Sequence, residues 1–308
     1  MVIARISHQN QGKHFPEYIK DLADLSGSLV KALELLYVSK GLKKACRLIV
    51  CDAGRLRRIK KVIRAYGLSV EISSCRYIIE RDGNKTYYTG YSTPQRLTDT
   101  GMGFFYLYIA RTGKAARLLK ICEEHGHERE LAEILGYPQC CINFYNKHIG
   151  GCVKKKIDFM FITAKYTNTP FPHPFLNNII SRCFDSTLLS HYPCSFNCRA
   201  SLDIARRRLD FIISLSQALA DYLIRCLKSA IIFTPDSGIY QMASVLLKDG
   251  EIYFNKAYVS AINKAAILDI LMASDRARIV GKKRLILMNK NKILRNFNGN
   301  GVNLFIFQ

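Results

Sequence analysis

The order of apolar and polar residues divides the first third of the chain into a helical lead-in and an α/β pattern. Residues 17–41 place apolar side chains at helical spacing. Residues 46–73 are typical of a strand, a turn, an amphipathic basic helix and a second strand. Residues 75–91 are predicted to form a hairpin around an Asp-Gly pair, and residues 101–112 a buried strand. The first region is therefore predicted to be an α/β layer.

The pattern changes twice more along the chain. Residues 115–230 are predicted to be helical, with irregular loops rich in Pro, His and Asn such as residues 167–178. Residues 231–308 return to alternating patterns, with hairpins that turn at Asp249-Gly250 and near residues 289–291, separated by a helix. This last region is predicted to be a small α+β appendage.

Length and composition agree with this division. A chain of 308 residues with 49% hydrophobic content exceeds one usual domain. We predict an α/β and α+β protein with an N-terminal α/β domain (1–114), a central helical cysteine-rich domain (115–230) and a small C-terminal α+β domain of β-hairpins (231–308). No apolar run approaches the ~20 residues that span a bilayer, and the start lacks the apolar segment of a signal peptide. We expect a cytoplasmic protein with no membrane partner.

The net charge points to a polyanionic partner. The 46 Lys and Arg residues against 24 Asp and Glu give a formal charge of +22. Such a field attracts nucleic acid, and we favour tRNA, although the same charges could simply be spread over a solvated surface. If nucleic acid binds, the basic segments 55–64, 205–208 and 276–284 should form one continuous surface that leads to the reactive thiols.

Two short motifs place thiols directly after a Tyr-Pro pair. In the first, LGYPQCC, one helix is predicted to end at Gly136 and the next to begin at Pro138, whose missing N–H costs nothing there. Cys140 and Cys141 then lie in the first helical turn, where free N–H groups and the helix dipole favour thiolate. Their side chains point about 100° apart, so one sulfur is expected to meet the core and the other a site.

The second motif, HYPCSFNC, has the same order. Pro193 is predicted to open a long helix with Cys194 and Cys198 on one face of its first turns. Cβ atoms four residues apart in a helix are separated by about 5–6 Å, whereas a disulfide needs about 3.8 Å, so the spacing suits two thiolates on one metal centre. The sulfurs of Cys194, Cys198 and one of Cys140 or Cys141 should therefore converge.

Eleven cysteines in a chain of this kind are expected to be reduced thiols, metal ligands or nucleophiles. Thiolates select zinc, Cu(I) or iron–sulfur centres. Structural zinc sites usually have four ligands in short paired spacings such as C-x2-C, and neither motif has that form. Three sulfurs with an open position favour an iron–sulfur cluster, with zinc as the first alternative and metal-free thiols as the second.

The two motifs together resemble the signature of a little-characterised archaeal family, marked by Gly-Tyr-Pro-x-Cys-Cys and Pro-Cys-Ser-x-x-Cys-x-x-Ser. The resemblance covers residues 131–210 and implies a site without naming a reaction. Its motif positions here are Tyr137, Pro138, Cys140, Cys141, Pro193, Cys194, Ser195, Cys198 and Ser201. Ser201 stands where radical S-adenosylmethionine enzymes have a third cysteine, so the sequence argues against that class.

Other side chains near the motifs complete the candidate site. His148, on the predicted face of Cys141, and His191, beside the second motif, are candidate proton shuttles, with a packing role as the alternative for each. The remaining candidates are Ser195 for catalysis, Tyr137 and Ser201 for cofactor contact, and Cys183 as an outside ligand to the metal.

Three classes of function follow. The first is an enzyme whose cysteine-ligated cluster modifies a nucleic acid, most plausibly a tRNA, or delivers sulfur to it. The second is a non-catalytic nucleic-acid-binding protein with a structural zinc site. The third is a metal-free thiol enzyme, which requires a histidine within hydrogen-bond reach of Cys140 or Cys141. An open coordination position would distinguish the first class from the second.

Overall fold

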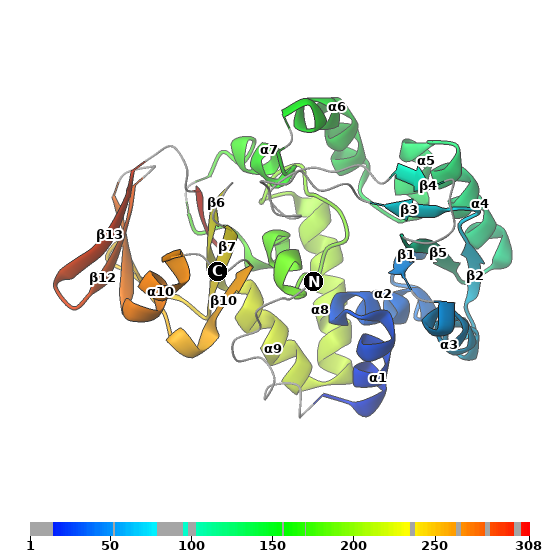
Figure 1. Ribbon diagram of the computed structural model, residues 1–308, viewed down its shortest axis with the longest axis horizontal. Helices are drawn as coiled ribbons and strands as arrows, with labels where there is room; N and C mark the ends of the chain where they lie inside the picture. Colours follow the sequence, from blue (N-terminus) through cyan, green and yellow to red (C-terminus); the bar gives the residue numbers. More distant parts are fainter. Residues whose placement is uncertain are drawn as a thin grey trace.

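The computed structural model describes residues 15–51, 53–78, 95–97, 103–155, 157–169, 171–234, 238–262, 266–280, 284–298 and 303–308. The Asp-Gly turn of the hairpin predicted for residues 75–91 lies outside these residues. Runs of helices and runs of antiparallel strands follow one another along the described chain, which is an α+β arrangement (Figure 1). No helix in the described ranges is both long and apolar enough to cross a membrane.

The N-terminal region is built on a three-stranded sheet. Its elements are α1 (Glu17–Ser26), α2 (Leu29–Ser39), β1 (Ala45–Val50), α3 (Ala53–Ala65), β2 (Ser69–Ile72), β3 (Arg76–Ile78), β4 (Gln95–Leu97), β5 (Phe105–Ala110) and α4 (Gly113–Glu124). The sheet order is β1-β5-β2, and β3 and β4 form a separate pair. The predicted strand, helix and strand at residues 46–73 are therefore present.

The position of β5 corrects the predicted α/β layer. β5 lies between β1 and β2 and pairs antiparallel with both, so Ala110 is opposite Ala45 on one side and Ser69 on the other. Its side chains alternate between two cores, since Leu107 and Ile109 join the largest core whereas its tyrosines face a smaller one. An apolar strand buried on both faces takes the central position, and β1 and β2 are left without a parallel partner.

The central region is helical, as predicted, but its last helix is divided. Its elements are α5 (Glu128–Ile134), α6 (Gln139–Lys155), α7 (Met160–Lys165), the 3-10 helices η2 (Phe175–Asn177) and η3 (Ile180–Phe184), α8 (Arg199–Leu215) and α9 (Gln217–Leu227). The sequence predicted one helix through α8 and α9. Ser216 instead has extended backbone angles, and its Oγ accepts a hydrogen bond from the Leu219 N–H at 3.3 Å, which caps a new helix.

The C-terminal region contains two antiparallel sheets. Its elements are β6 (Ser229–Thr234), β7 (Gly238–Ala243), β8 (Leu246–Lys248), β9 (Glu251–Tyr253), η4 (Lys256–Tyr258), β10 (Val259–Ile262), α10 (Ala266–Ala273), β11 (Arg276–Val280), β12 (Arg284–Asn289), β13 (Lys292–Asn298) and β14 (Asn303–Ile306). The sheet orders are β10-β7-β6-β14 and β13-β12-β11-β9-β8. Both predicted hairpin turns, at Asp249-Gly250 and at residues 289–291, are confirmed.

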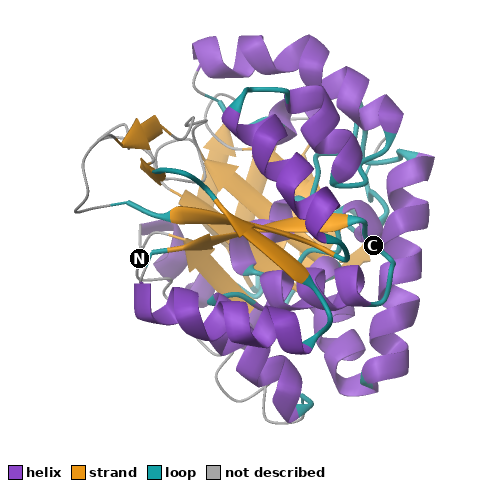
Figure 2. Cartoon of the chain, turned by 90° about the vertical axis from the view of Figure 1, so that its right-hand side faces the viewer, coloured by secondary structure: helices purple, strands orange, loops and turns teal. Residues whose placement is uncertain are grey.

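The four-stranded sheet is part of the main body of the molecule. Ile231 and Phe233 of β6 belong to the largest core, which also contains Ile19 and Leu33 of the N-terminal helices. Ile232, on the opposite face of the same strand, belongs to a second core with the five-stranded sheet. The C-terminal region was predicted to be a small appendage, but its four-stranded sheet packs on both faces. The five-stranded sheet is the part that projects at one end of the molecule (Figure 1). In the view turned by 90°, strands occupy the centre, with helices above, below and to the right of them (Figure 2).

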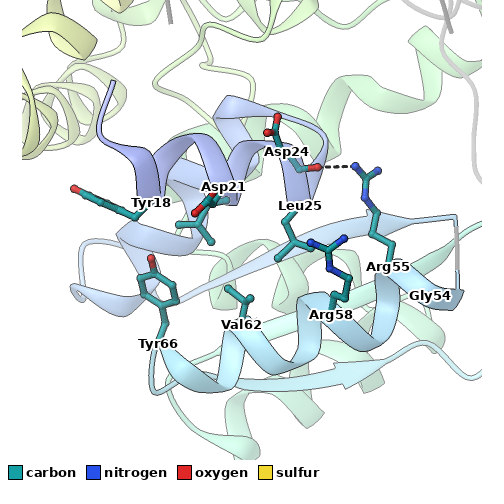
Figure 3. Close-up of a pocket in the computed structure, with 10 residues that line it drawn as sticks. Tyr18, Asp21, Asp24, Leu25, Gly54, Arg55, Arg58, Val62 and Tyr66 are labelled. Atoms are coloured by element: carbon teal, nitrogen blue, oxygen red, sulfur yellow. Dashed lines mark hydrogen bonds between the residues drawn. The ribbon is translucent and has the colours of Figure 1, made fainter. Parts of the chain in front are cut away.

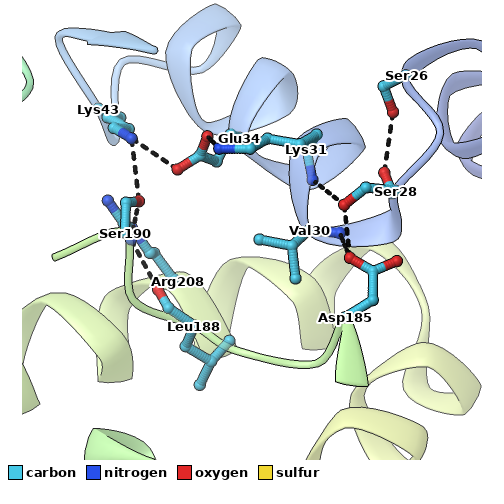
Figure 4. Close-up of polar contacts among 10 residues, drawn as sticks. All are labelled: Ser26, Ser28, Val30, Lys31, Glu34, Lys43, Asp185, Leu188, Ser190 and Arg208. Atoms are coloured by element: carbon cyan, nitrogen blue, oxygen red, sulfur yellow. Dashed lines mark hydrogen bonds and ion pairs between the residues drawn. The ribbon is translucent and has the colours of Figure 1, made fainter. Parts of the chain in front are cut away.

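A buried ion pair joins the N-terminal helices to the central region (Figure 4). The Lys43 Nζ donates to Glu34 Oε1 at 2.8 Å and to Ser190 Oγ at 3.0 Å, and both charged side chains are at most 3% exposed. Arg208 of α8 donates to the same Ser190 hydroxyl at 3.3 Å. Burial alone would raise the pKa of Glu34, but Lys31 and Lys43 hold it well below its usual range. The carboxylate therefore stays charged inside the protein.

A second contact fixes the same junction at the start of α2. The Asp185 carboxylate accepts hydrogen bonds from the backbone N–H groups of Leu29 at 2.6 Å and Val30 at 3.1 Å. It also accepts one from the Ser28 hydroxyl at 2.5 Å. A carboxylate at a helix N-terminus satisfies free N–H groups and interacts favourably with the helix dipole. The segment after Asp185, which leads to the second cysteine motif, is thus anchored to α2.

The ion pair generates a prediction about stability. Replacing Lys43 alone, in Lys43→Met, leaves Glu34 buried with one counter-charge fewer and should lower the free energy of unfolding by about 3–5 kcal/mol. The double variant Glu34→Leu/Lys43→Met removes both charges and should recover most of that loss. Urea unfolding followed by circular dichroism measures both values. An equal loss in the single and double variants would show that packing, and not the uncompensated charge, is responsible.

Candidate metal centre

The first cysteine motif lies at the start of α6, as the sequence predicts. α5 ends before Gly136, which has a φ of +78°, a conformation that favours glycine. The Pro138 carbonyl then accepts the first hydrogen bonds of α6, from the N–H groups of Cys141 at 2.9 Å and Ile142 at 3.0 Å. Cys140 and Cys141 therefore both occupy the first turn of a 17-residue helix.

The second motif differs from the prediction. The sequence predicted that Pro193 opens a helix, but α8 begins only at Arg199 and Cys198 is its N-cap. The preceding residues form a turn in which the Cys198 N–H donates to the Ser195 carbonyl at 3.0 Å. Cys194 and Cys198 thus belong to the two ends of a turn and not to one helix face.

Side chains from neighbouring segments explain why this turn replaces a helix. The Thr163 hydroxyl donates to the Pro193 carbonyl at 2.8 Å, and the Phe196 N–H donates to Thr167 Oγ1 at 2.9 Å. The Asn177 amide donates to the carbonyls of Phe196 at 2.9 Å and Cys198 at 3.2 Å. These backbone groups are bonded to side chains, so the turn is satisfied without helical hydrogen bonds.

The two motifs bring four sulfur atoms together. The Sγ atoms of Cys140, Cys141, Cys194 and Cys198 all lie within 4.8 Å of one another. Three of these distances are 3.6 Å between Cys141 and Cys198, 3.7 Å between Cys140 and Cys198, and 3.9 Å between Cys140 and Cys141. The predicted convergence is confirmed, and the cluster is compatible with metal binding.

The expectation that only one of the two adjacent cysteines reaches the site was wrong. Cys141 is 2% exposed and Cys140 is exposed, yet both sulfurs approach Cys198. Side chains that point about 100° apart at a helix terminus can flank a third group placed between their directions. Cys198 occupies that position, so the pair acts as two neighbouring donors.

The surroundings favour negative charge on these sulfurs. Cys140 and Cys141 lie at the N-terminus of α6, and Cys198 caps the N-terminus of α8, so two positive dipole ends face the cluster. Hydrogen bonds from Cys141 and Cys194 lower the pKa of Cys198. Hydrogen bonds with Cys194 and Cys198, together with burial, raise the pKa of Cys141. The pKa shifts of the coupled thiols therefore run in opposite directions, and ligation of a metal by all four sulfurs must release protons.

Ser201 and His191 form a hydrogen-bonded pair next to Cys141. Ser201 Oγ lies 3.4 Å from Cys141 Sγ, and His191 Nε2 lies 2.9 Å from the same hydroxyl. Burial, and next the charge of Arg208, lower the pKa of His191 to about 3, so its ring is neutral at pH 7. His191 thus reaches the sulfur through Ser201, and Ser201 contacts a ligand of the cluster.

The other predicted site residues have different surroundings. The rings of Phe144 and Tyr166 lie 4.7 Å and 4.9 Å from the ring of His148, which is not part of the sulfur cluster. Ser195 provides the carbonyl that accepts from Cys198. The Tyr137 ring lies 5.2 Å from that of His191 and lines an adjacent cavity. The roles predicted from the sequence for His148, Ser195 and Tyr137 remain predictions.

Cys183 does not join the four-sulfur group. It is 1% exposed within the largest hydrophobic core, where burial raises its pKa to about 12. The sequence predicted it only as the outside candidate for a fourth ligand. The second adjacent cysteine fills that place, so the two motifs provide all four sulfurs.

The residues that hold the second turn are not among the candidates predicted from the sequence. Thr167 and Asn177 belong to residues 167–178, which the sequence predicts to be an irregular loop, and Thr163 lies within the preceding helix α7. Asn177 is fully buried, although Asn is usually exposed. The available signal was a run of Thr and Asn residues among prolines, since these side chains bond readily to backbone groups.

Comparisons of the chain with known protein families, with curated proteins and with solved structures find no match.

The role of Asn177 can be tested against its neighbour. Asn177→Leu should remove the side-chain donor of the Phe196 carbonyl and one of the two donors of the Cys198 carbonyl, which also accepts from the Leu202 N–H, and should lower stability by about 1–3 kcal/mol. The turn should also loosen, so thiol-reactive probes should label Cys194 and Cys198 faster under native conditions. Mass spectrometry of labelled peptides gives the rates.

Asn178→Leu is the matched control. Asn178 is equally buried, and its amide bonds to Leu227 and Ser229, away from the cysteine turn. It should lower stability similarly without accelerating labelling of Cys194. Equal labelling in both variants would mean that Asn177 does not specifically hold the turn.

Proposed function

We propose that the four cysteines bind a single tetrahedral metal ion, with zinc as the favoured metal. The distances between the cysteine Sγ atoms are the main support for this proposal. A Zn–S bond of about 2.3 Å gives sulfur–sulfur edges of about 3.8 Å in a regular tetrahedron. The three distances of 3.6, 3.7 and 3.9 Å bracket that value without any rearrangement of the backbone.

These separations favour one ion over the multi-iron cluster expected from the sequence. In [2Fe–2S] and [4Fe–4S] centres, cysteines bind different iron atoms, so sulfurs on different irons are held farther apart than sulfurs on one ion. Here all four sulfurs lie within 4.8 Å of one another. A cluster would require the two motifs to separate, whereas a single ion fits them as they are.

The charge of such a centre is also compensated. Four thiolates around a divalent ion carry two net negative charges, and the N-termini of α6 and α8 both face them. Arg208 and Lys43, both buried, lie close enough to His191 for their charges to lower its pKa. A thiolate-rich centre is therefore stable in this part of the protein.

A four-sulfur site leaves no protein-defined open position, which supports a structural role. The ion would join the start of α6 to the turn before α8, segments that are separated by more than fifty residues in the chain. It would also fix His191 and Tyr137 at the wall of the adjacent cavity. Of the three classes of function, the non-catalytic one with a structural metal site agrees best with this geometry.

The metal proposal predicts a specific loss. The protein purified without oxygen should contain about one equivalent of zinc per chain and show no visible iron–sulfur absorption. Cys198→Ser should lose the metal, because Cys198 approaches both Cys140 and Cys141. Cobalt substitution provides a second readout, since tetrathiolate coordination has an intense visible spectrum.

Cys183→Ala is the control, because Cys183 is a buried cysteine outside the cluster. It should retain one equivalent of zinc even if its stability falls. Several irons per chain, or metal loss in Cys183→Ala but not in Cys198→Ser, would contradict the proposal. Full thiol reactivity of metal-free protein with normal stability would favour the thiol-enzyme alternative.

A second candidate function, contact with nucleic acid, is favoured by α3. This 13-residue helix contains six Lys and Arg residues and no acidic residue. Arg57, Lys61 and Arg64 are exposed and recur at helical spacing on one face. Arg55 and Arg58 instead line a groove of about 860 Å³ between α1 and α3, where Arg55 donates to the Asp24 carbonyl at 2.6 Å (Figure 3).

The basic segments do not form the continuous surface that was predicted. α3 and the strands β11–β12 lie at opposite ends of the molecule (Figure 1). Arg208 is 3% exposed and bonds internally to Leu188 and Ser190, so it is not available to phosphates. Any RNA contact, including the tRNA favoured by the sequence, is therefore proposed for α3 alone.

Salt dependence tests this second proposal. Replacing Arg57, Lys61 and Arg64 by Ala should weaken binding of a tRNA transcript and make its log–log salt slope shallower by about 2, at about 0.7 per phosphate contact for single strands. Replacing Lys248, Lys290 and Lys292 by Ala removes the same charge at the other end of the molecule and should leave the slope unchanged. Equal effects of the two triple variants would show that the net charge of the protein, and not α3 in particular, accounts for tRNA binding.

A further inference from the structure

The four sulfurs of the proposed metal centre differ in their access to solvent. Cys141 and Cys198 are 2% and 7% exposed, and Cys194 is half-buried. Cys140 is the exposed member of the group, although its sulfur lies 3.7 Å from that of Cys198 and 3.9 Å from that of Cys141. A reactant that arrives from solvent therefore meets the sulfur of Cys140 before the other three.

The hydrogen bonds around the cluster are also unequal. Ser201 Oγ lies 3.4 Å from Cys141 Sγ and 2.9 Å from His191 Nε2. When Cys141 is a thiolate ligand, its sulfur can only accept, so the Ser201 hydroxyl donates to it. The hydroxyl has one hydrogen, so the bond to His191 requires that Nε2–H donates to Ser201 Oγ. The two donors in series stabilise the negative charge on Cys141, which also lines the adjacent cavity.

Cys140 does not have this support. Within the part of the chain that the structure describes, the hydrogen-bond contacts of Cys140 Sγ are with the sulfurs of Cys141 and Cys198 alone. Once all of these sulfurs bind a metal as thiolates, none of them has a proton to donate. The N-terminus of α6 acts on both adjacent cysteines, so it does not distinguish between them. Among the four sulfurs, Cys140 therefore combines exposure with the absence of a hydroxyl or N–H donor.

These two properties determine what kind of reaction the centre favours. The nucleophilic form of cysteine is the thiolate, and coordination to a metal keeps a cysteine in that form without a neighbouring base. Four thiolates around a divalent ion carry two net negative charges, so the exposed thiolate remains electron-rich. Its natural reactants are soft carbon electrophiles, which accept an electron pair from sulfur.

We propose that Cys140 is the alkyl acceptor of this centre and that it reacts with small, soft carbon electrophiles such as alkyl halides and alkyl sulfonates. This inference rests on the proposed metal. An electron pair of the sulfur forms the new S–C bond, the bond between carbon and the leaving group breaks, and the leaving group departs with its electron pair as an anion. The step consumes no oxidant, reductant or proton. Cys140 becomes a neutral thioether, and the centre retains one net negative charge.

Alkylation at pH 6 tests the proposal, with Cys51 as a reference in the same molecule. Cys51 is also exposed but lies outside the cluster. An ordinary uncoordinated thiol is less than about 1% ionised at this pH, whereas a metal-bound thiolate needs no deprotonation. With iodoacetamide as the probe, peptide mass spectrometry should find Cys140 modified about tenfold faster than Cys51 and than the other three ligands. Equal rates at Cys140 and Cys51, or faster reaction at Cys141 or Cys194, would overturn the proposal.

Two matched variants count the alkyl groups on the intact protein. Cys51→Ala should still take up one alkyl group per chain at pH 6, because it leaves the cluster unchanged. Cys140→Ala should take up none in the same time. Uptake of one group at another cluster sulfur at the unchanged rate would mean that the whole cluster is reactive, and Cys140 would lose its special role. The position is mapped on the unaltered protein, so the conclusion does not depend on how well Cys140→Ala folds.

Metal removal separates this inference from the proposed function. A chelator that removes the zinc should slow alkylation of Cys140 at pH 6 at least fivefold, with circular dichroism to show that the protein stays folded. An unchanged rate would mean that the metal does not activate the sulfur. Zinc is quantified on the same samples. One equivalent of zinc with an unreactive Cys140 contradicts this inference alone, whereas a protein that takes up no zinc contradicts the proposed function and this inference together.

Discussion

The hydrogen bonds to the backbone of residues 193–198 are the constraint on which the cysteine site depends. Thr163, Thr167 and Asn177 take backbone groups that would otherwise belong to a helix. If this segment continued α8 toward Pro193, Cys194 and Cys198 would lie on the side of a helix and their Sγ atoms would follow its spacing. The turn instead places Cys198 at the N-terminus of α8, where its sulfur can meet those on α6.

The turn is itself held in place by contacts with residues that are distant in the sequence. The segment before it is anchored to α2 by Asp185 and by the contacts of Lys43 and Arg208 with Ser190. Phe196 of the turn itself packs against the rings of Phe305 and Phe307 near the C-terminus, at centroid distances of 6.0 and 5.1 Å. The cysteine site is therefore assembled by contacts between regions far apart in sequence, and a single ion would add one further connection among them.

Local sequence signals correctly predicted the features that depend on the backbone preferences of neighbouring residues. The α5 stop at Gly136, the start of α6 after Pro138 and both C-terminal hairpin turns follow from backbone preferences of a few residues. The insertion of β5 between β1 and β2, and the loss of the helix at Pro193, depend on partners that periodicity does not reveal. Cys183 was misassigned for the same reason, because its burial in the largest core depends on tertiary packing.

The distribution of charge matters more for function here than its total. Lys43, Arg47 and Arg208 are cations that the protein uses internally, each with a carboxylate, a carbonyl or an aromatic ring. The exposed cations of α3 do not take part in these internal contacts, so they can attract polyanions. Beside the cysteines, Lys43 lies over the Tyr137 ring and Arg182 over the Tyr192 ring, so internal cations are also matched with aromatic faces there. A charge of +22 therefore says little about the interior, where Lys43, Arg47 and Arg208 each have a partner of their own.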